Sequence, residues 1–138
     1  MKYIIVLILS FFQLYCTAQN EYIIIGSGGG FSGETVQYKL FRDGTVLKGN
    51  GIVEIRFNKS SHIRKREAKK LLKKINKVAS ESFSHPGNMR YFVYMIKPRS
   101  EIKCTWGDEK FEISEDLKAI YREIFQKLSG LEYRLVEK

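Results

Sequence analysis

Runs of β-branched and aromatic residues, partly alternating with polar ones, mark the first half of the chain as strand-forming. The segments are Glu21–Ile25, Thr35–Phe41, Thr45–Leu47 and Ile52–Phe57. Asp43-Gly44 predicts a hairpin turn of type I′, which needs positive φ at both central residues. Gly49-Asn50-Gly51 predicts a second turn. We therefore expect antiparallel strands over residues 22–57, three of them in a meander.

From Arg64 to Phe83 the hydrophobic period changes from two residues to three or four, which predicts a helix with one apolar face. That face consists of Ala68, Leu71, Leu72, Ile75, Val78 and Ala79. Ser60 or Ser61 is placed to cap the start of the helix. The cluster Ser84–Asn88 contains Pro and Gly, which end helices.

The second half of the chain predicts another hairpin and another helix. Arg90–Ile96 and Glu101–Trp106 read as strands joined through Lys97–Ser100. Ser114 then caps a helix over residues 115–128, with two acidic residues in its first turn. Its apolar stripe is Leu117, Ile120, Tyr121, Ile124, Phe125 and Leu128, and Gly130 suits the position just after the helix.

This order of elements, β-β-β-α-β-β-α, predicts an α+β fold. We expect an antiparallel sheet of about five strands with two helices packed on one face, because each helix has a single apolar stripe to bury. The shared core should include Tyr38, Leu40, Leu71, Leu72, Ile75, Ile120, Ile124 and Leu128. The opposite face of the sheet should be more polar. Leu131–Val136 remains open between a tail and an edge strand.

The N-terminus has the pattern of a secretory signal peptide. Lys2 precedes a mostly apolar run over residues 3–15, and small residues at Cys16 and Ala18 suit cleavage after Ala18. The run is too short for a transmembrane helix, which needs about 20 apolar residues. Lipid attachment at Cys16 is disfavoured, because Tyr15 is bulky and Gln13 is polar. We expect residues 1–18 to be removed and residues 19–138 to form one domain of an exported protein, periplasmic or secreted.

The composition limits the classes of protein to which this chain can belong. The 138 residues carry a net charge of +9 and are 43% hydrophobic, which fits a small basic globular domain rather than a disordered chain. After cleavage only Cys104 remains, so no internal disulfide can form. Cys104 is predicted to be a buried apolar residue; the alternative is a nucleophile activated by His62 or His85. No spacing of His or Cys suggests zinc, and we expect neither enzymatic activity nor a cofactor.

The glycine-rich segment Gly26–Gly33 has two superficial resemblances to phosphate-binding loops. A strand rather than a helix is predicted to follow it, and Glu34 stands where a P-loop has its lysine, so neither nucleotide motif is expected to function. One interpretation is a bulge or wide turn, for which glycine is suited. The other makes Phe31 an exposed anchor for a protein partner, within the binding loop Gly29, Gly30, Phe31, Ser32 and Gly33.

The outer face of the first predicted helix is rich in lysine. It carries Lys69, Lys70, Lys73, Lys74 and Lys77. Such a face is either simply solvated or binds an anionic partner. Nucleic acid is disfavoured because the chain has an export signal and no aromatic residue interleaves with these lysines to stack on bases. Anionic lipid or polysaccharide of the cell envelope is the partner that this alternative predicts.

The chain resembles a group of small exported bacterial proteins. The resemblance lies in the Gly29-Gly30-Phe31 start, the Tyr38-x-Leu40 strand, the Asp43-Gly44 turn and the order of elements. More distantly, these features are similar to emfourin-type inhibitors of thermolysin-like metalloproteases. This resemblance implies a non-enzymatic protein-binding module whose partner is a protease. The alternative function is the envelope protein that binds anionic lipid or polysaccharide through its lysine-rich helix.

Overall fold

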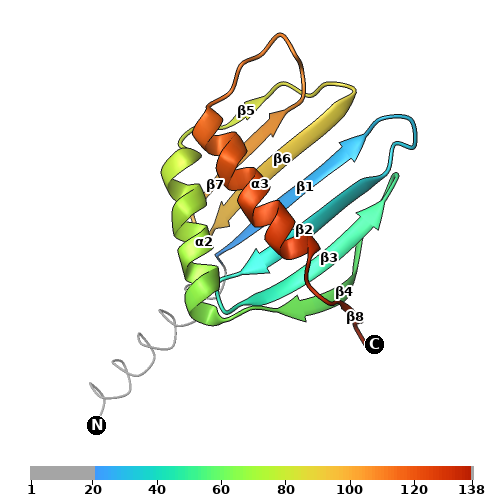
Figure 1. Cartoon of the computed structure of the whole chain (residues 1–138), viewed down its shortest axis with the longest axis vertical. Helices are drawn as coiled ribbons and strands as arrows, with labels where there is room; N and C mark the ends of the chain where they lie inside the picture. The colour runs from blue at the N-terminus through green and yellow to red at the C-terminus, as the bar shows by residue number, and fades with distance from the viewer. Residues whose placement is uncertain (1–20, 138) are drawn as a thin grey trace, which may run out of the picture.

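Eight strands form one sheet in the computed structural model, which describes residues 21–137 (Figure 1). Along the chain they are β1 (Tyr22–Gly29), β2 (Thr35–Phe41), β3 (Thr45–Gly51), β4 (Arg56–His62), β5 (Phe83–Ser84), β6 (Met89–Lys97), β7 (Ser100–Trp106) and β8 (Arg134–Leu135). Across the sheet the order is β5-β7-β6-β1-β2-β3-β4-β8. The signal peptide predicted at residues 1–18 lies outside the described residues and stays a prediction.

Both helices, α2 (Lys65–Val78) and α3 (Glu115–Ser129), cover the same face of the sheet (Figure 1). Their buried residues recur every three or four positions: Ala68, Leu71, Leu72 and Ile75 in α2, and Leu117, Tyr121, Ile124 and Leu128 in α3. Burying one such large aliphatic side chain contributes about 1.5–3 kcal/mol. The core between helices and sheet therefore fixes where both helices lie.

The predicted α+β class and the predicted shared core are confirmed. Tyr38, Leu40, Leu71, Leu72, Ile75, Ile124 and Leu128 are buried there, and Ile120 is partly buried against them. Ser114 caps α3 as predicted, because its hydroxyl accepts a hydrogen bond from the amide of Leu117 at 3.3 Å. No helix within residues 21–137 is both long and apolar enough to cross a membrane.

The expected number of about five strands is wrong. The first meander has four strands, and β5 and β8 add two residues each at the two edges. Because β5 pairs with β7 in parallel, the sheet is mixed rather than purely antiparallel. Leu131–Val136, left open by the sequence, includes the edge strand β8, which pairs with β4.

Several predicted boundaries are also wrong. The turn lies at residues 52–55 rather than 49–51, so Ile52–Phe57 is not a strand and β4 begins only at Arg56. Ser60 and Ser61 belong to β4, and the N-cap of α2 is Arg64, with no side-chain cap. The helix ends at Val78 instead of Phe83. Pairing across β3 and β4 overrides the turn preference of Gly49–Gly51, since the tertiary ladder satisfies the main-chain groups there.

The turn at Asp43-Gly44 does join β2 to β3, but its type differs from type I′. Only Gly44 has positive φ (99°), and its amide donates to the carbonyl of Phe41 at 3.1 Å. The Asp43 carboxylate accepts from the amide of Thr45 at 2.9 Å. A glycine is thus needed at one position of this turn, not two.

The sheet face opposite the helices is more polar than the core face, as expected, since it carries Gln37, Lys39 and Arg90. It also has aromatic residues. Alternation along the strands places Tyr22, Phe41, Phe92 and Tyr94 on it, and Phe92 is fully buried there. The Lys39 ammonium lies 4.1 Å from the centre of the Tyr22 ring. Such lysines shield the aromatic rings from water while keeping their own charge solvated.

Candidate functional site

The connection between β1 and β2 holds Phe31 away from the rest of the molecule. Gly29, Gly30 and Gly33 have φ values of 98°, 70° and 66°, in the region that glycine adopts without strain. The Gly30 amide donates to the carbonyl of Asn88 at 2.8 Å, which connects the turn to the loop between β5 and β6. Phe31 is 112% exposed relative to a reference peptide. The exposure expected of an anchor is therefore present, whereas binding at Gly29–Gly33 stays a prediction.

The first glycines of the segment serve a different purpose. Gly26 and Gly28 lie inside β1, so the bulge or wide turn predicted over Gly26–Gly33 is confined to its second half. A Cβ at Gly26 would come within 2.6 Å of the Phe92 ring. The Arg90 guanidinium donates to the Thr35 hydroxyl at 2.8 Å, across the strand at Gly28. These two glycines make room for side chains on the open face of the sheet.

Phe31 is part of a larger exposed apolar surface at one end of the sheet. The connections β1–β2, β3–β4 and β5–β6 all lie at this end (Figure 1). A Cβ at Gly33 would lie 3.8 Å from Ile52, and one at Gly30 would lie 2.9 Å from the Met89 sulfur. Ile52, Val53 and Met89 are 68%, 96% and 41% exposed. We call Phe31, Ile52, Val53 and Met89 the apolar tip.

The sequence did not indicate the contribution of Ile52 and Val53 to this surface, because both were assigned to a strand. Their apolar character is typical of a strand, and only the pairing of β3 with β4 leaves them in the turn. The polar side chains around the apolar residues pair with one another. The Asn50 amide donates to the Glu34 carboxylate at 3.0 Å, and Arg56 pairs with Glu54 at 3.2 Å. Four exposed apolar side chains gathered at one end of the sheet are typical of an interaction site.

The lysine-rich face of α2 divides into two parts. Lys69, Lys70, Lys73 and Lys77 are exposed, as predicted for the outer face. Lys74 instead pairs with Glu123 of α3 at 2.5 Å, and Glu67 pairs with Lys127. The side of α2 that adjoins α3 is thus neutralised by carboxylates. Four of the five predicted lysines remain available to an anionic partner, and binding at them stays a prediction.

Cys104 lies in the core, as the sequence predicted. It is 1% exposed, and its thiol donates to the main-chain oxygen of Glu81 at 3.3 Å. Burial raises the pKa of this thiol, which disfavours the nucleophilic thiolate. His85 stacks on Phe111, with ring centres 3.5 Å apart, and His62 is at the far end of β4. Neither histidine hydrogen-bonds Cys104 among the described residues, so the arrangement lacks the base that a cysteine nucleophile requires.

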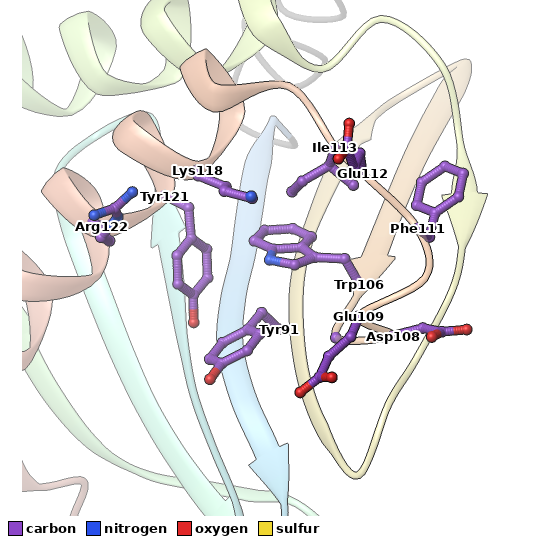
Figure 2. A pocket seen from close by; sticks show the side chains of 11 residues that line it. Tyr91, Trp106, Asp108, Glu109, Phe111, Glu112, Ile113, Lys118, Tyr121 and Arg122 are labelled. Atoms are coloured by element: carbon purple, nitrogen blue, oxygen red, sulfur yellow. The ribbon is translucent and has the colours of Figure 1, made fainter.

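A cleft of about 590 Å³ lies between α3 and the loop that leads into it (Figure 2). Tyr91 of β6, Trp106 of β7 and Tyr121 of α3 line it together; the ring centres of Trp106 and Tyr121 are 5.0 Å apart. The loop side of the cleft carries Asp108, Glu109, Phe111 and Glu112, and the helix side carries Lys118 and Arg122. The sequence did not indicate this cleft, because its shape depends on how the loop after Trp106 and α3 pack beside Tyr91.

Among residues 21–137 no group of three or more His, Cys, Asp or Glu side chains is arranged to hold a metal ion. The glycine pattern that resembles a dinucleotide motif is followed by β2, so no helix N-terminus points at it. Comparison with protein-family models and with curated proteins found no match to this chain. The resemblance to emfourin-type inhibitors therefore stays a prediction.

Proposed function

We propose that this protein is an exported, non-enzymatic binding module that recognises another protein through the apolar tip. The observation that carries the proposal is the complete exposure of Phe31 on a turn that glycines hold in place. An aromatic side chain surrounded by other apolar residues is the usual anchor of a protein interface. Burying a fully exposed Phe side chain contributes about 1.5–3 kcal/mol to association.

The turn is already ordered by hydrogen bonds before any partner binds. The amides of Gly29 and Gly30 donate to Glu34 and Asn88 at 3.3 and 2.8 Å. Less conformational entropy is then lost on binding, so more of the burial energy is retained as affinity. A projecting side chain on a rigid turn suits a concave apolar pocket on the partner. The resemblance to emfourin-type inhibitors makes a thermolysin-like metalloprotease the first partner to test.

The test compares capture of a partner and inhibition of thermolysin by the chain from residue 19 and by its Phe31→Ala variant. We expect the variant to lose at least about tenfold in affinity, which corresponds to about 1.4 kcal/mol. Leu135→Ala is the matched control, because Leu135 is also an exposed apolar residue (70%) but lies on β8. Equal capture and equal inhibition by the Phe31→Ala variant would show that the tip is not the binding surface.

A second candidate function is supported by the exposed lysines of α2. Lys69, Lys70, Lys73 and Lys77 follow one another at intervals of one, three and four residues, so they form one continuous cationic face. Lys69 and Lys73 also line a shallow groove together with Arg42, whose guanidinium is paired with Glu21. Such a face attracts anionic lipid headgroups or an acidic polysaccharide of the envelope. Metalloprotease binding and anion binding use separate surfaces and can be tested separately.

A further inference from the structure

The aromatic cleft differs in charge from the rest of this basic protein. Asp108, Glu109 and Glu112 all lie on its loop side, within five residues of each other, while the chain as a whole has a net charge of +9. On the helix side, the Lys118 ammonium is already paired with Glu115 at 3.0 Å. The cleft thus presents more free carboxylate than free cation, and its field favours a positively charged ligand.

The floor of the cleft also has one hydrogen-bond donor without a partner. Trp106 is 8% exposed, and its indole N–H makes no hydrogen bond to the described residues. No completely buried side-chain nitrogen or oxygen among them lacks a partner, so this N–H must be accessible to solvent. Figure 2 shows the nitrogen on the side of the ring that faces Tyr91 and Tyr121.

The Tyr121 hydroxyl is directed away from the indole and makes no hydrogen bond with it among residues 21–137. That hydroxyl donates to the main-chain oxygen of Gly26 at 2.9 Å, which orients it toward β1. The Trp106 N–H therefore offers a hydrogen bond to an acceptor that enters from outside, such as a peptide carbonyl. An apolar stem of the ligand would pack on the aromatic rings of Tyr91 and Trp106.

We propose that this cleft binds a peptide segment through a basic side chain, with Glu109 pairing the cation, Glu112 adding to the negative field from the other end of the loop, and Trp106 contacting the peptide backbone. A cationic head on an apolar stem, next to a carbonyl, matches the three features of the cleft together. The cleft adjoins the apolar tip, because the main chain of Gly107 packs against Met89. The inference rests on the proposed function only in taking the ligand to be a segment of a protein.

The alternative occupant is an anionic ligand held by Arg122 and Lys118. Such a ligand would lie opposite Asp108, Glu109 and Glu112, and Lys118 would have to leave Glu115. Repulsion between like charges makes this the less favourable arrangement. The two ligand classes respond in opposite ways to removal of the acidic side chains, so one experiment separates them.

Trp106 is the only tryptophan of the chain, so its fluorescence reports on the cleft directly. The probe is the blocked tripeptide acetyl-Gly-Arg-Gly-amide, compared with the same peptide carrying neutral citrulline or Glu in place of Arg. We expect saturable quenching by the arginine peptide, weakening as salt rises, and affinity at least about fivefold lower for the citrulline peptide. Amide shifts in NMR spectra should fall in residues 106–112 and 118–122.

The Glu109→Gln/Glu112→Gln variant should bind the arginine peptide at least about fivefold more weakly. Glu132→Gln/Glu137→Gln changes the net charge equally at exposed positions outside the cleft and should bind normally. Phe31→Ala should also bind normally, which separates failure of this site from failure of the apolar tip. Equal binding of the citrulline peptide, preference for the glutamate peptide, or no change in either fluorescence or NMR would overturn the proposal.

Discussion

Tyr121 links the second helix to the centre of the sheet. Its hydroxyl donates to the Gly26 carbonyl at 2.9 Å, and its ring meets Trp106 edge-on with centres 5.0 Å apart. Burial raises the pKa of the Tyr121 hydroxyl well above its ordinary value, because the phenolate would lose its hydration in this site. The same cause raises the pKa of Tyr133. These two tyrosines make the stability of the fold sensitive to alkaline pH.

Replacing Tyr121 by Phe removes the hydrogen bond and leaves the Gly26 carbonyl without that donor. We expect the free energy of unfolding at pH 7 to fall by about 1 kcal/mol. Since the folded pKa lies above the unfolded value of about 10, ionisation favours the unfolded chain. The wild-type protein should therefore keep its stability below about pH 10 and lose it above that pH, and Tyr121→Phe should lose less.

Urea unfolding at pH 7 and near pH 11 measures both effects. Tyr94→Phe is the control, because Tyr94 is half-buried on the opposite face of the sheet and stacks on Phe92 instead of reaching the helix layer. If the alkaline loss is the same in the wild type and in Tyr121→Phe, the hydroxyl of Tyr121 is not a source of that loss.

At the scale of elements, β1 is the central strand that both halves of the sheet pair with. It lies between β2 and β6, and its register sets Gly26 opposite Phe92 on one side and Gln37 on the other. Phe92 is 3% exposed although it is on the face without helices. Because Gly26 has no side chain, the Phe92 ring can pack closely against the central strand.

Gly26→Ala should therefore destabilise the protein despite the better strand propensity of alanine. The new Cβ would lie 2.6 Å from both the Phe92 ring and the Val36 carbonyl, so one of them must move. We expect a loss of about 1–3 kcal/mol in the free energy of unfolding, measured by urea denaturation. Gly130→Ala is the matched control. Gly130 has φ of −83°, and the nearest atom to a Cβ there is 3.4 Å away.

Gly130→Ala should be neutral or stabilise the protein by up to about 1 kcal/mol, since alanine restricts the unfolded chain. If the two variants have the same stability, close packing at Gly26 does not determine the choice of glycine. Thermal unfolding followed by circular dichroism provides a second measure of the same difference.

At the scale of the whole molecule, positive charge is distributed unevenly. Two ion pairs between α2 and α3, Lys74–Glu123 and Glu67–Lys127, neutralise the boundary between the helices. Among residues 21–137 the exposed lysines Lys69, Lys70, Lys73 and Lys77 take part in no ion pair, while the aromatic cleft is acidic. The molecule thus offers three chemically different surfaces: an apolar tip, a cationic helix face and an acidic aromatic cleft.

If the cationic face binds the envelope, the chain from residue 19 should bind vesicles that contain anionic lipid and dissociate as salt rises. Each lysine near such a surface contributes about 1 kcal/mol. We expect Lys70→Gln/Lys77→Gln to weaken binding about tenfold or more in a vesicle sedimentation assay. Lys59→Gln/Lys110→Gln, at exposed positions away from α2, has the same net charge and should bind nearly as well as the wild type. Binding that does not respond to salt contradicts this function.

The periodic part of the fold could be predicted from sequence. Two helices with one apolar stripe each, the hairpin β6–β7 and the shared core from Tyr38 to Leu128 follow from spacing alone. Burial on one face imposes a hydrophobic period of two residues on a strand and of 3.6 residues on a helix. This period can be recognised within a short stretch of sequence. The exposure of Phe31 agrees with one of the two interpretations of the glycine-rich segment, since glycines on both sides of an aromatic residue predict a turn.

Contacts between residues far apart in the sequence determine the edge strands, the apolar tip and the aromatic cleft. Two-residue strands such as β5 and β8 form only because Cys104 and Lys59 provide partners for their main-chain groups, and they are too short to show a period. Ile52 and Val53 became part of the apolar tip because pairing of β3 with β4 placed the turn at them. The aromatic cleft brings Tyr91 together with side chains from residues 106–122, so its shape depends on how α3 packs against the sheet. Such packing cannot be predicted from a short stretch of sequence, because the burial energy depends on which surfaces meet in three dimensions.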